Sequence, residues 1–179
     1  MVAGRGAGLK PAEEVFVNEI AGSLDESRAT VPLRVSRGAR IDMTRAIDAL
    51  TDIDWLGPRV IGPAQREDVR RISTVLELPI FDGSGPGPIR KTALVDIGIP
   101  AARMGPLVVQ VGWQSDSLSP LFPVFAGQLR ITARILVLDG FYAPPLGRLG
   151  LLIDRHILHL VARRTAEAFL ARLAAHIEG

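Results

Sequence analysis

Residues Gly147 to His176 read GRLGLLIDRHILHLVARRTAEAFLARLAAH, without a proline and with the last glycine at Gly150. Ala, Leu and Arg dominate this stretch, and all three are strong helix formers. At 100° per residue, one narrow face collects Leu151, Leu158, Ala162, Thr165, Phe169 and Leu173. The pattern predicts one amphipathic helix of roughly 28 residues, about 42 Å long, that lies across a large surface.

Strand patterns fill most of the chain before this helix. Alternating or β-branched runs predict strands at 29–35, 69–78, 89–99, 107–113, 122–131 and 135–141. Pro32 places the first of them at a sheet edge or a bulge. The connection at Thr132 lacks the Gly or Asn of a tight hairpin, so it is either irregular or part of one bent strand. Successive strands followed by one long helix favour an antiparallel α+β fold.

Two shorter elements and a corner complete the pattern. Asp42 is a plausible N-cap for a helix to about Thr51. Its predicted inner face is Met43, Ala46, Ile47 and Leu50. Val15–Ile20 is compatible with either a short helix or a strand. In GFYAPPLGRLG, which ends at Gly150, the two prolines predict a sharp corner before the long helix.

The end of the chain resembles a known superfamily. The segments LFPVFAGQLRI, LDGFYAPPLGRLG and LLIDRHILHLVA are similar to the START-like, pollen-allergen-like superfamily (SRPBCC), which includes polyketide cyclase/dehydrase and lipid-transport proteins. The likeness is firmest over Val108–Ile177 and is strongest to a bacterial branch. It implies a helix-grip fold, in which a curved antiparallel sheet wraps around the C-terminal helix and leaves an apolar cavity between them. The superfamily shares no catalytic signature.

The composition allows one ordinary folded core. The chain has 179 residues, of which 47% are hydrophobic and 22% charged, so it fits one domain. The absence of cysteine excludes disulfides and thiolate catalysis. The net charge is +2, and adjacent arginines occur only as the pairs Arg70–Arg71 and Arg163–Arg164. Because nucleic-acid binding usually needs a clustered basic stripe, we expect no nucleic-acid partner.

The two ends of the chain set the expected domain organisation. The N-terminal sequence MVAGRGAGLKPAEE has no apolar core of a signal peptide, and no apolar run approaches the roughly 18–20 residues of a membrane span. We therefore expect a cytoplasmic protein. Residues 1–28 are expected to form a partly flexible N-terminal extension. Residues 29–179 are expected to form the START-like ligand-binding domain, and an oligomer is possible.

Metal and cofactor sites are not expected. His156 and His159 are three residues apart on the predicted helix and could share a metal, whereas Asp154 diverges from His156 by about 200°. The third ligand and the supporting groups that a metal site usually needs are not visible in the sequence. There is no Gly-x-Ser-x-Gly elbow and no phosphate loop that ends in Gly-Lys-Ser/Thr.

Three residues are candidates for acid–base catalysis. His156 and Tyr142 lie near the corner where the helix follows the last strand, and either could move a proton beside a carbonyl. The alternative is that Asp154 and Arg155 form a surface pair and Tyr142 packs against the corner. Asp96 would have a raised pKa if it faced the cavity, and would be an ordinary strand residue if it faced water.

Large aromatic side chains concentrate in the last third of the chain. Together with the helix face they give the predicted ligand-contacting set, which is Trp113, Phe122, Phe125, Tyr142, Leu158, Ala162, Thr165 and Phe169. Thr165 is a weak polar handle, although its hydroxyl could instead bond to the carbonyl four residues earlier. For any one of these residues, a filled core is the simpler interpretation.

Three functional hypotheses follow. The first is the binding of a hydrophobic small molecule, a lipid or a polyketide-like compound, between the sheet and the C-terminal helix. The second is an enzyme of the polyketide cyclase or dehydratase type that uses the same cavity with His156, Tyr142 or Asp96. The third is a structural or protein-interaction domain with a closed core. The sequence alone does not decide whether the protein is an enzyme.

Overall fold

The computed structural model describes residues 30–56, 69–78, 89–100, 105–115, 124–143 and 155–179. Their elements are, in chain order, β1 (Val31–Gly38), α2 (Met43–Thr51), the 3-10 turn η1 (Asp54–Leu56), β2 (Val69–Leu78), β3 (Ile89–Gly98), β4 (Leu107–Ser115), β5 (Val124–Ile131), β6 (Ile135–Ala143) and α3 (Arg155–Glu178). The predictions for the N-terminal extension and for Val15–Ile20 lie outside the described residues.

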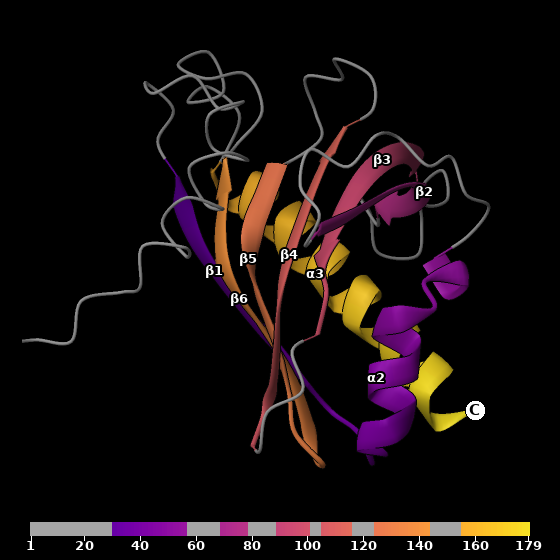
Figure 1. The fold of residues 1–179 in the computed structure, drawn as a ribbon. Coiled ribbons are helices and arrows are strands. Elements are labelled where there is room, and N and C mark those ends of the chain that lie inside the picture. The colour runs from indigo at the N-terminus through magenta and orange to yellow at the C-terminus, as the bar shows by residue number, and fades with distance from the viewer. Residues whose placement is uncertain (1–29, 57–68, 79–88, 101–104, 116–123, 144–154) are drawn as a thin grey trace, which may run out of the picture.

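The strands form one antiparallel sheet in the order β1-β6-β5-β4-β3-β2. β1 and β2 are its two edges, and Pro32 lies exposed in β1, as its missing N–H donor predicted. Helix α3 contacts β1 and β6 as well as β2, so both edges of the sheet reach the same helix (Figure 1). A sheet can do this only by curving around the helix. The predicted α+β helix-grip fold is therefore confirmed.

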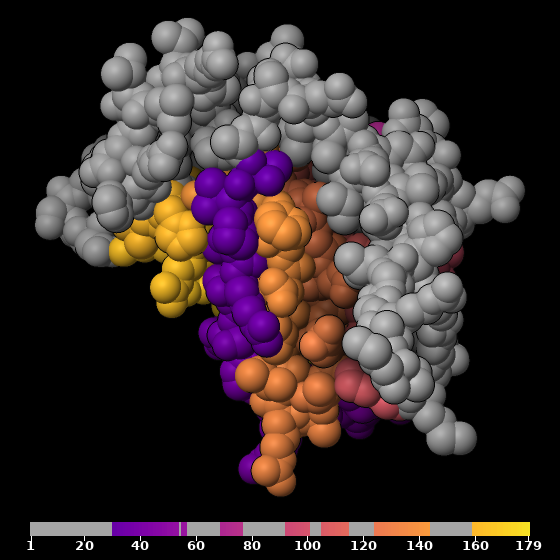
Figure 2. Space-filling view, turned by 90° about the vertical axis from the view of Figure 1, so that its left-hand side faces the viewer, coloured from indigo at the N-terminus to yellow at the C-terminus, as the bar shows by residue number. Residues whose placement is uncertain are grey.

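The edge of the sheet at β1 lies directly against the helix. Figure 2 shows β1 in indigo running beside β6 in orange, with α3 in yellow along its other side. In β1, Leu33 and Val35 are buried, while the alternate residues Arg34 and Ser36 are exposed. This alternation is the one expected of a strand with one face on the core.

Helix α3 has the predicted faces. Among the residues of the predicted inner face whose side chains are described, Ala162, Thr165, Phe169 and Leu173 are all buried. The helix has 24 described residues and ends two residues after the predicted end at His176. The predicted start at Gly147 lies outside the described residues. Glu178 Oε1 accepts a hydrogen bond from the Arg40 N–H at 3.1 Å, which links the end of α3 to the segment before α2.

Helix α2 begins where predicted, and its buried face differs from the predicted inner face at one position. The Asp42 carboxylate accepts hydrogen bonds from the N–H groups of Thr44 and Arg45, at 2.8 and 3.3 Å, and so caps the first turn. Ala46 and Leu50 are buried, but Ile47 is 39% exposed. Ala49 is buried in its place, and α2 packs on α3.

The connection between β5 and β6 is held by a side chain instead of a glycine. The Thr132 hydroxyl oxygen accepts hydrogen bonds from the N–H groups of Arg134 and Ile135, at 3.4 and 3.2 Å. The carbonyls of Ala133 and Arg134 accept from Ile41 and Ala39, both at 3.1 Å. The connection is therefore irregular, one of the two predicted alternatives, and it also fixes the chain as it leaves β1.

Candidate functional site

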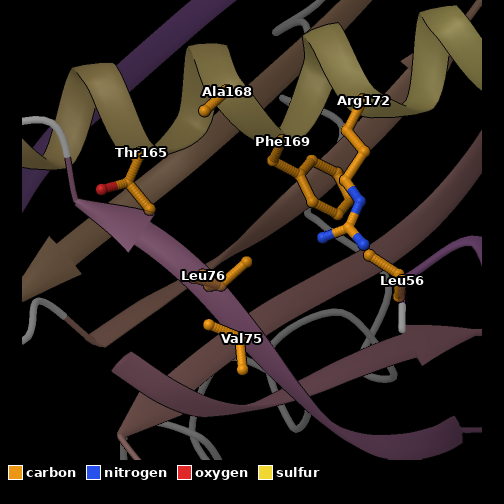
Figure 3. Close-up of a pocket in the computed structure, with 7 residues that line it drawn as sticks. All are labelled: Leu56, Val75, Leu76, Thr165, Ala168, Phe169 and Arg172. Carbon is orange, nitrogen blue, oxygen red and sulfur yellow. The ribbon is translucent and has the colours of Figure 1, made fainter. Parts of the chain in front are cut away.

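A pocket of about 460 Å³ lies between α3 and the edge strand β2. Its lining, shown in Figure 3, consists of Leu56, Val75, Leu76, Thr165, Ala168, Phe169 and Arg172. Five of these side chains are apolar, one carries a hydroxyl and one a guanidinium. Small-molecule sites typically have volumes of about 300–1,000 Å³ and a mostly apolar lining with a few polar groups. The pocket has both properties.

The helical side of the pocket is a single stripe. Thr165, Ala168, Phe169 and Arg172 follow the spacing i, i+3, i+4, i+7, which places their side chains on one face of a helix. Thr165 and Phe169 are buried, whereas Ala168 and Arg172 are exposed. The stripe therefore runs along the flank of the buried face, where α3 emerges from the sheet.

The opposite side is built by η1 and β2. Trp55 Nε1 donates a hydrogen bond to the Ala49 carbonyl at 2.7 Å, which holds η1 against the end of α2. The Thr74 hydroxyl donates to the Leu56 carbonyl, which ties η1 to β2. These bonds present the Leu56 side chain to the pocket. Val75 is 42% exposed because it alternates with the buried Thr74 and Leu76 and points to the other face of β2, so the pocket lies at the border of the core.

Two polar groups face this apolar surface. The Thr165 hydroxyl donates to the Val161 carbonyl at 2.9 Å, the alternative weighed from the sequence, and its oxygen still has acceptor capacity. The Arg172 side chain runs beside the Phe169 ring toward Leu56 (Figure 3). Among the described residues, no carboxylate forms an ion pair with Arg172.

The structure places the predicted ligand-contacting residues in two groups. Thr165 and Phe169 line the pocket. The others whose side chains are described lie buried between the sheet and α3, namely Trp113, Phe125, Tyr142 and Ala162. Phe122 and the side chain of Leu158 lie outside the described residues. That the buried group contacts a ligand stays a prediction.

Phe169 connects the pocket to an aromatic cluster in the core. Its ring centroid lies 5.8 Å from that of Trp55 and 5.9 Å from that of Trp113, which stacks on Phe125 at 4.3 Å. Trp113 Nε1 is buried, and no described residue accepts its hydrogen. A buried donor without an acceptor costs about 1–3 kcal/mol. A ligand oxygen or a water at this position would remove that cost.

Tyr142 lies beside His159, which was not among the predicted acid–base candidates. Its hydroxyl lies 3.4 Å from Nδ1 of His159, and the two ring centroids are 5.9 Å apart. Tyr142 is buried, and this burial raises the pKa of its phenol. His156 lies in α3, but its side chain is outside the described set. The sequence signal for His159 was its place one helical turn after His156.

Between about pH 8 and 11, we expect the free energy of unfolding to fall less in the Tyr142→Phe variant than in the wild type. The ordinary tyrosine pKa is 10.0, and the raised value in the folded state means that folding holds the phenolic proton more tightly. The contribution of Tyr142 is therefore fully present below pH 10 and is lost as the pH rises through the folded-state pKa. Denaturant unfolding at about pH 8 and 11 measures the loss, which should be smaller in the variant. Identical losses in both proteins would contradict a buried, protonated phenol.

Asp96 lies on the sheet face opposite to the helix. Its neighbours Val95 and Ile97 point into the core, and strand alternation turns Asp96 the other way. Arg71 stands opposite it on β2, and its Nε and Nη2 donate to the two carboxylate oxygens at 2.7 and 2.8 Å. The side chain of Asp96 is only 6% exposed, and this hydrogen bond raises the pKa of Arg71. Asp96 is therefore a partnered carboxylate outside the pocket.

Five pocket residues were not predicted from the sequence, namely Leu56, Val75, Leu76, Ala168 and Arg172. Ala168 and Arg172 could have been predicted from the sequence, because they share a helical stripe with Thr165 and Phe169. Leu56, Val75 and Leu76 could not, because the local pattern does not state which strand and turn lie against α3.

Metal ligands and membrane spans were also sought in the described ranges. No group of three His, Asp or Glu side chains that could hold a metal ion occurs there. No helix in that part of the chain is both long and apolar enough to cross a bilayer.

Neither a protein-family model nor a curated protein sequence matches the chain, but solved structures do. The Zhui aromatase/cyclase from Streptomyces sp. R1128 is 15% identical, with a TM-score of 0.57 over 84% of this chain and 94% of that one. The protein TTHA0849 from Thermus thermophilus is 12% identical, with a TM-score of 0.54 over 82% and 97% of the two chains. At such identities the shared property is the fold. The chain has the helix-grip fold that its resemblance to the START-like superfamily predicted.

Proposed function

We propose that this chain binds a hydrophobic small molecule in the pocket between α3 and β2. The observation that carries the proposal is the lining of that pocket, in which five apolar side chains surround the space and two polar groups stand on one helical stripe. Apolar surface removed from water stabilises a complex by about 25 cal/mol per Å². The apolar side chains would supply the affinity, and the polar groups would orient the ligand.

Two further observations support binding over a closed core. Phe169 belongs both to the pocket and to the aromatic cluster, so its ring lies between a ligand in the pocket and Trp113. The unpaired Trp113 Nε1 would gain an acceptor if a ligand oxygen reached it.

A reaction of the cyclase or dehydratase type is the second candidate. The fold likeness to an aromatase/cyclase and the approach of Tyr142 to His159 at 3.4 Å favour it. Binding is preferred because none of the seven pocket residues has a side chain that exchanges a proton readily near pH 7. Of the three predicted catalytic residues, Asp96 faces away from the helix, Tyr142 is not part of the lining, and the His156 side chain is not described.

A variant that fills the pocket tests the proposal. Ala168 is exposed and lines the pocket, so Ala168→Phe would occupy the space without touching the buried face of α3. The neutral fluorescent probe N-phenyl-1-naphthylamine should bind the wild type and bind this variant about tenfold more weakly, since a steric clash costs roughly 1–3 kcal/mol. Ala175→Phe is the matched control, because Ala175 is exposed on the same helix and does not line the pocket. Equal affinity of all three proteins for the probe would refute binding at this site.

A further inference from the structure

We propose that the ligand of this pocket is an amphiphile with an anionic end, and that Arg172 binds that end. The inference rests on the proposed function and adds the chemical class of the ligand. It starts from Arg172, because this is the one ionisable side chain among the seven described residues that line the pocket. Nothing acidic stands beside it in that lining to neutralise it.

Arg172 is distinguished from the other arginines of α3 that the structure describes. Arg163 is satisfied on the solvent side by Glu167, with Nε to Oε1 at 2.8 Å. Arg164 also has an interaction partner. Arg172 has no such partner among the described residues, and nine residues along a helix, at 100° each, turn it to the side opposite Arg163. Within the part of the chain that the structure describes, its guanidinium is therefore available to a group from outside.

The position of Arg172 sets the orientation of the ligand. The residue is exposed, while Thr165 and Phe169 on the same stripe are buried. The seven steps from Thr165 to Arg172 span about 10 Å along the helix axis. An apolar chain can therefore lie along Phe169 and Leu76 toward Thr165, with its charged end held at the rim, where it keeps part of its hydration.

The chemistry of the guanidinium favours a carboxylate or a phosphate as the charged end of the ligand. Arginine presents a planar fork of N–H donors that matches the oxygens of a carboxylate or a phosphate, and it stays charged at every physiological pH. Its methylene stem can rest on the Phe169 ring while the fork reaches the oxygens (Figure 3). A neutral alcohol of the same chain length would keep the apolar contacts and lose this pairing.

The test compares three probes that share one decyl chain, namely decanoate, decyl phosphate and 1-decanol. The sequence has two tryptophans, and both contact Phe169, so their fluorescence reports occupation of the pocket. In the wild type, at least one anionic probe should bind about three- to fivefold more tightly than 1-decanol, the gain expected for an exposed charge pair. The Arg172→Met variant should abolish the difference between the anionic probes and 1-decanol. Arg163→Met removes the same charge from the opposite side of α3 and should behave as the wild type.

The possible results separate the two proposals. A preference for decanoate alone or decyl phosphate alone supports the inference and identifies the head group. Equal binding of all three probes by the wild type overturns the anionic ligand but leaves the hydrophobic pocket intact. A preference that persists in Arg172→Met, or disappears in Arg163→Met, assigns the charge to another residue and refutes the role of Arg172. Failure of all three probes to bind overturns both proposals.

Discussion

Alanine at Gly127 is expected to destabilise the fold by about 3 kcal/mol or more, although the substitution adds a single methyl group. Gly127 in β5 stands opposite Gly140 in β6. A Cβ atom on Gly127 would lie 2.7 Å from Gly140 Cα and would overlap the carbonyl oxygen of Asp139. These atoms belong to the backbone of the neighbouring strand, so they can move only if the ladder between β5 and β6 opens.

The glycine pair has a structural purpose in the curved sheet. The Phe125 ring lies over Gly127, so that a Cβ there would also stand 2.7 Å from Cζ of that ring. The same ring stacks on Trp113 in the core. The absence of side chains at Gly127 and Gly140 therefore allows the two strands to approach closely where the aromatic cluster begins, which is the usual role of glycine inside a strand.

Gly38→Ala is the matched control for Gly127→Ala. Gly38 lies at the end of β1, and a Cβ atom there would meet nothing within 4 Å. The control should change the free energy of unfolding by less than about 0.5 kcal/mol. Urea unfolding of the three proteins, followed by circular dichroism, measures both effects. If Gly127→Ala were as stable as Gly38→Ala, the close approach of β5 and β6 would be wrong.

The elements of this fold were largely readable from local patterns. The alternation from Val69 to Leu78 arises because one face of the strand meets the core. The Asp42 cap needs only one side chain and two nearby N–H groups. Both depend on residues close together in the sequence. Ile47 was placed wrongly because apolar spacing alone does not say which flank of a short helix packs on α3.

The site was less readable because it depends on distant neighbours. The pocket exists where β2, an edge strand, meets the C-terminal half of α3, and the order of strands in a sheet is not contained in any one strand. Asp96 shows the same limit. Its sequence position gave the two possible faces, but its pairing with Arg71 required the register between β2 and β3.

The Phe169→Ala variant is expected to lose about 3–5 kcal/mol of stability, the usual cost of truncating a buried aromatic residue. Phe169 is buried, and its ring lies between Trp55 and Trp113, with centroids 5.8 and 5.9 Å away. Removing it takes contacts from η1 and from β4 at once. Thermal or urea unfolding measures the loss, and Leu160→Ala is the control, because Leu160 lies on the same helix and is 43% exposed.

The Phe169→Ala variant also tests whether the Phe169 ring separates the pocket from the core. Truncation at residue 169 joins the space beside Trp113 to the pocket of about 460 Å³, so the enlarged cavity should accept an apolar ligand more readily than the wild type does. A ligand that binds only the folded state stabilises it by RT ln(1 + [L]/Kd), so tighter binding gives a larger shift at the same ligand concentration. Saturating N-phenyl-1-naphthylamine should therefore raise the melting temperature of Phe169→Ala more than that of the wild type or of Leu160→Ala. A shift no larger than that of the controls would show that Phe169 does not separate the pocket from the core, and the path from the pocket to Trp113 would then have to be abandoned.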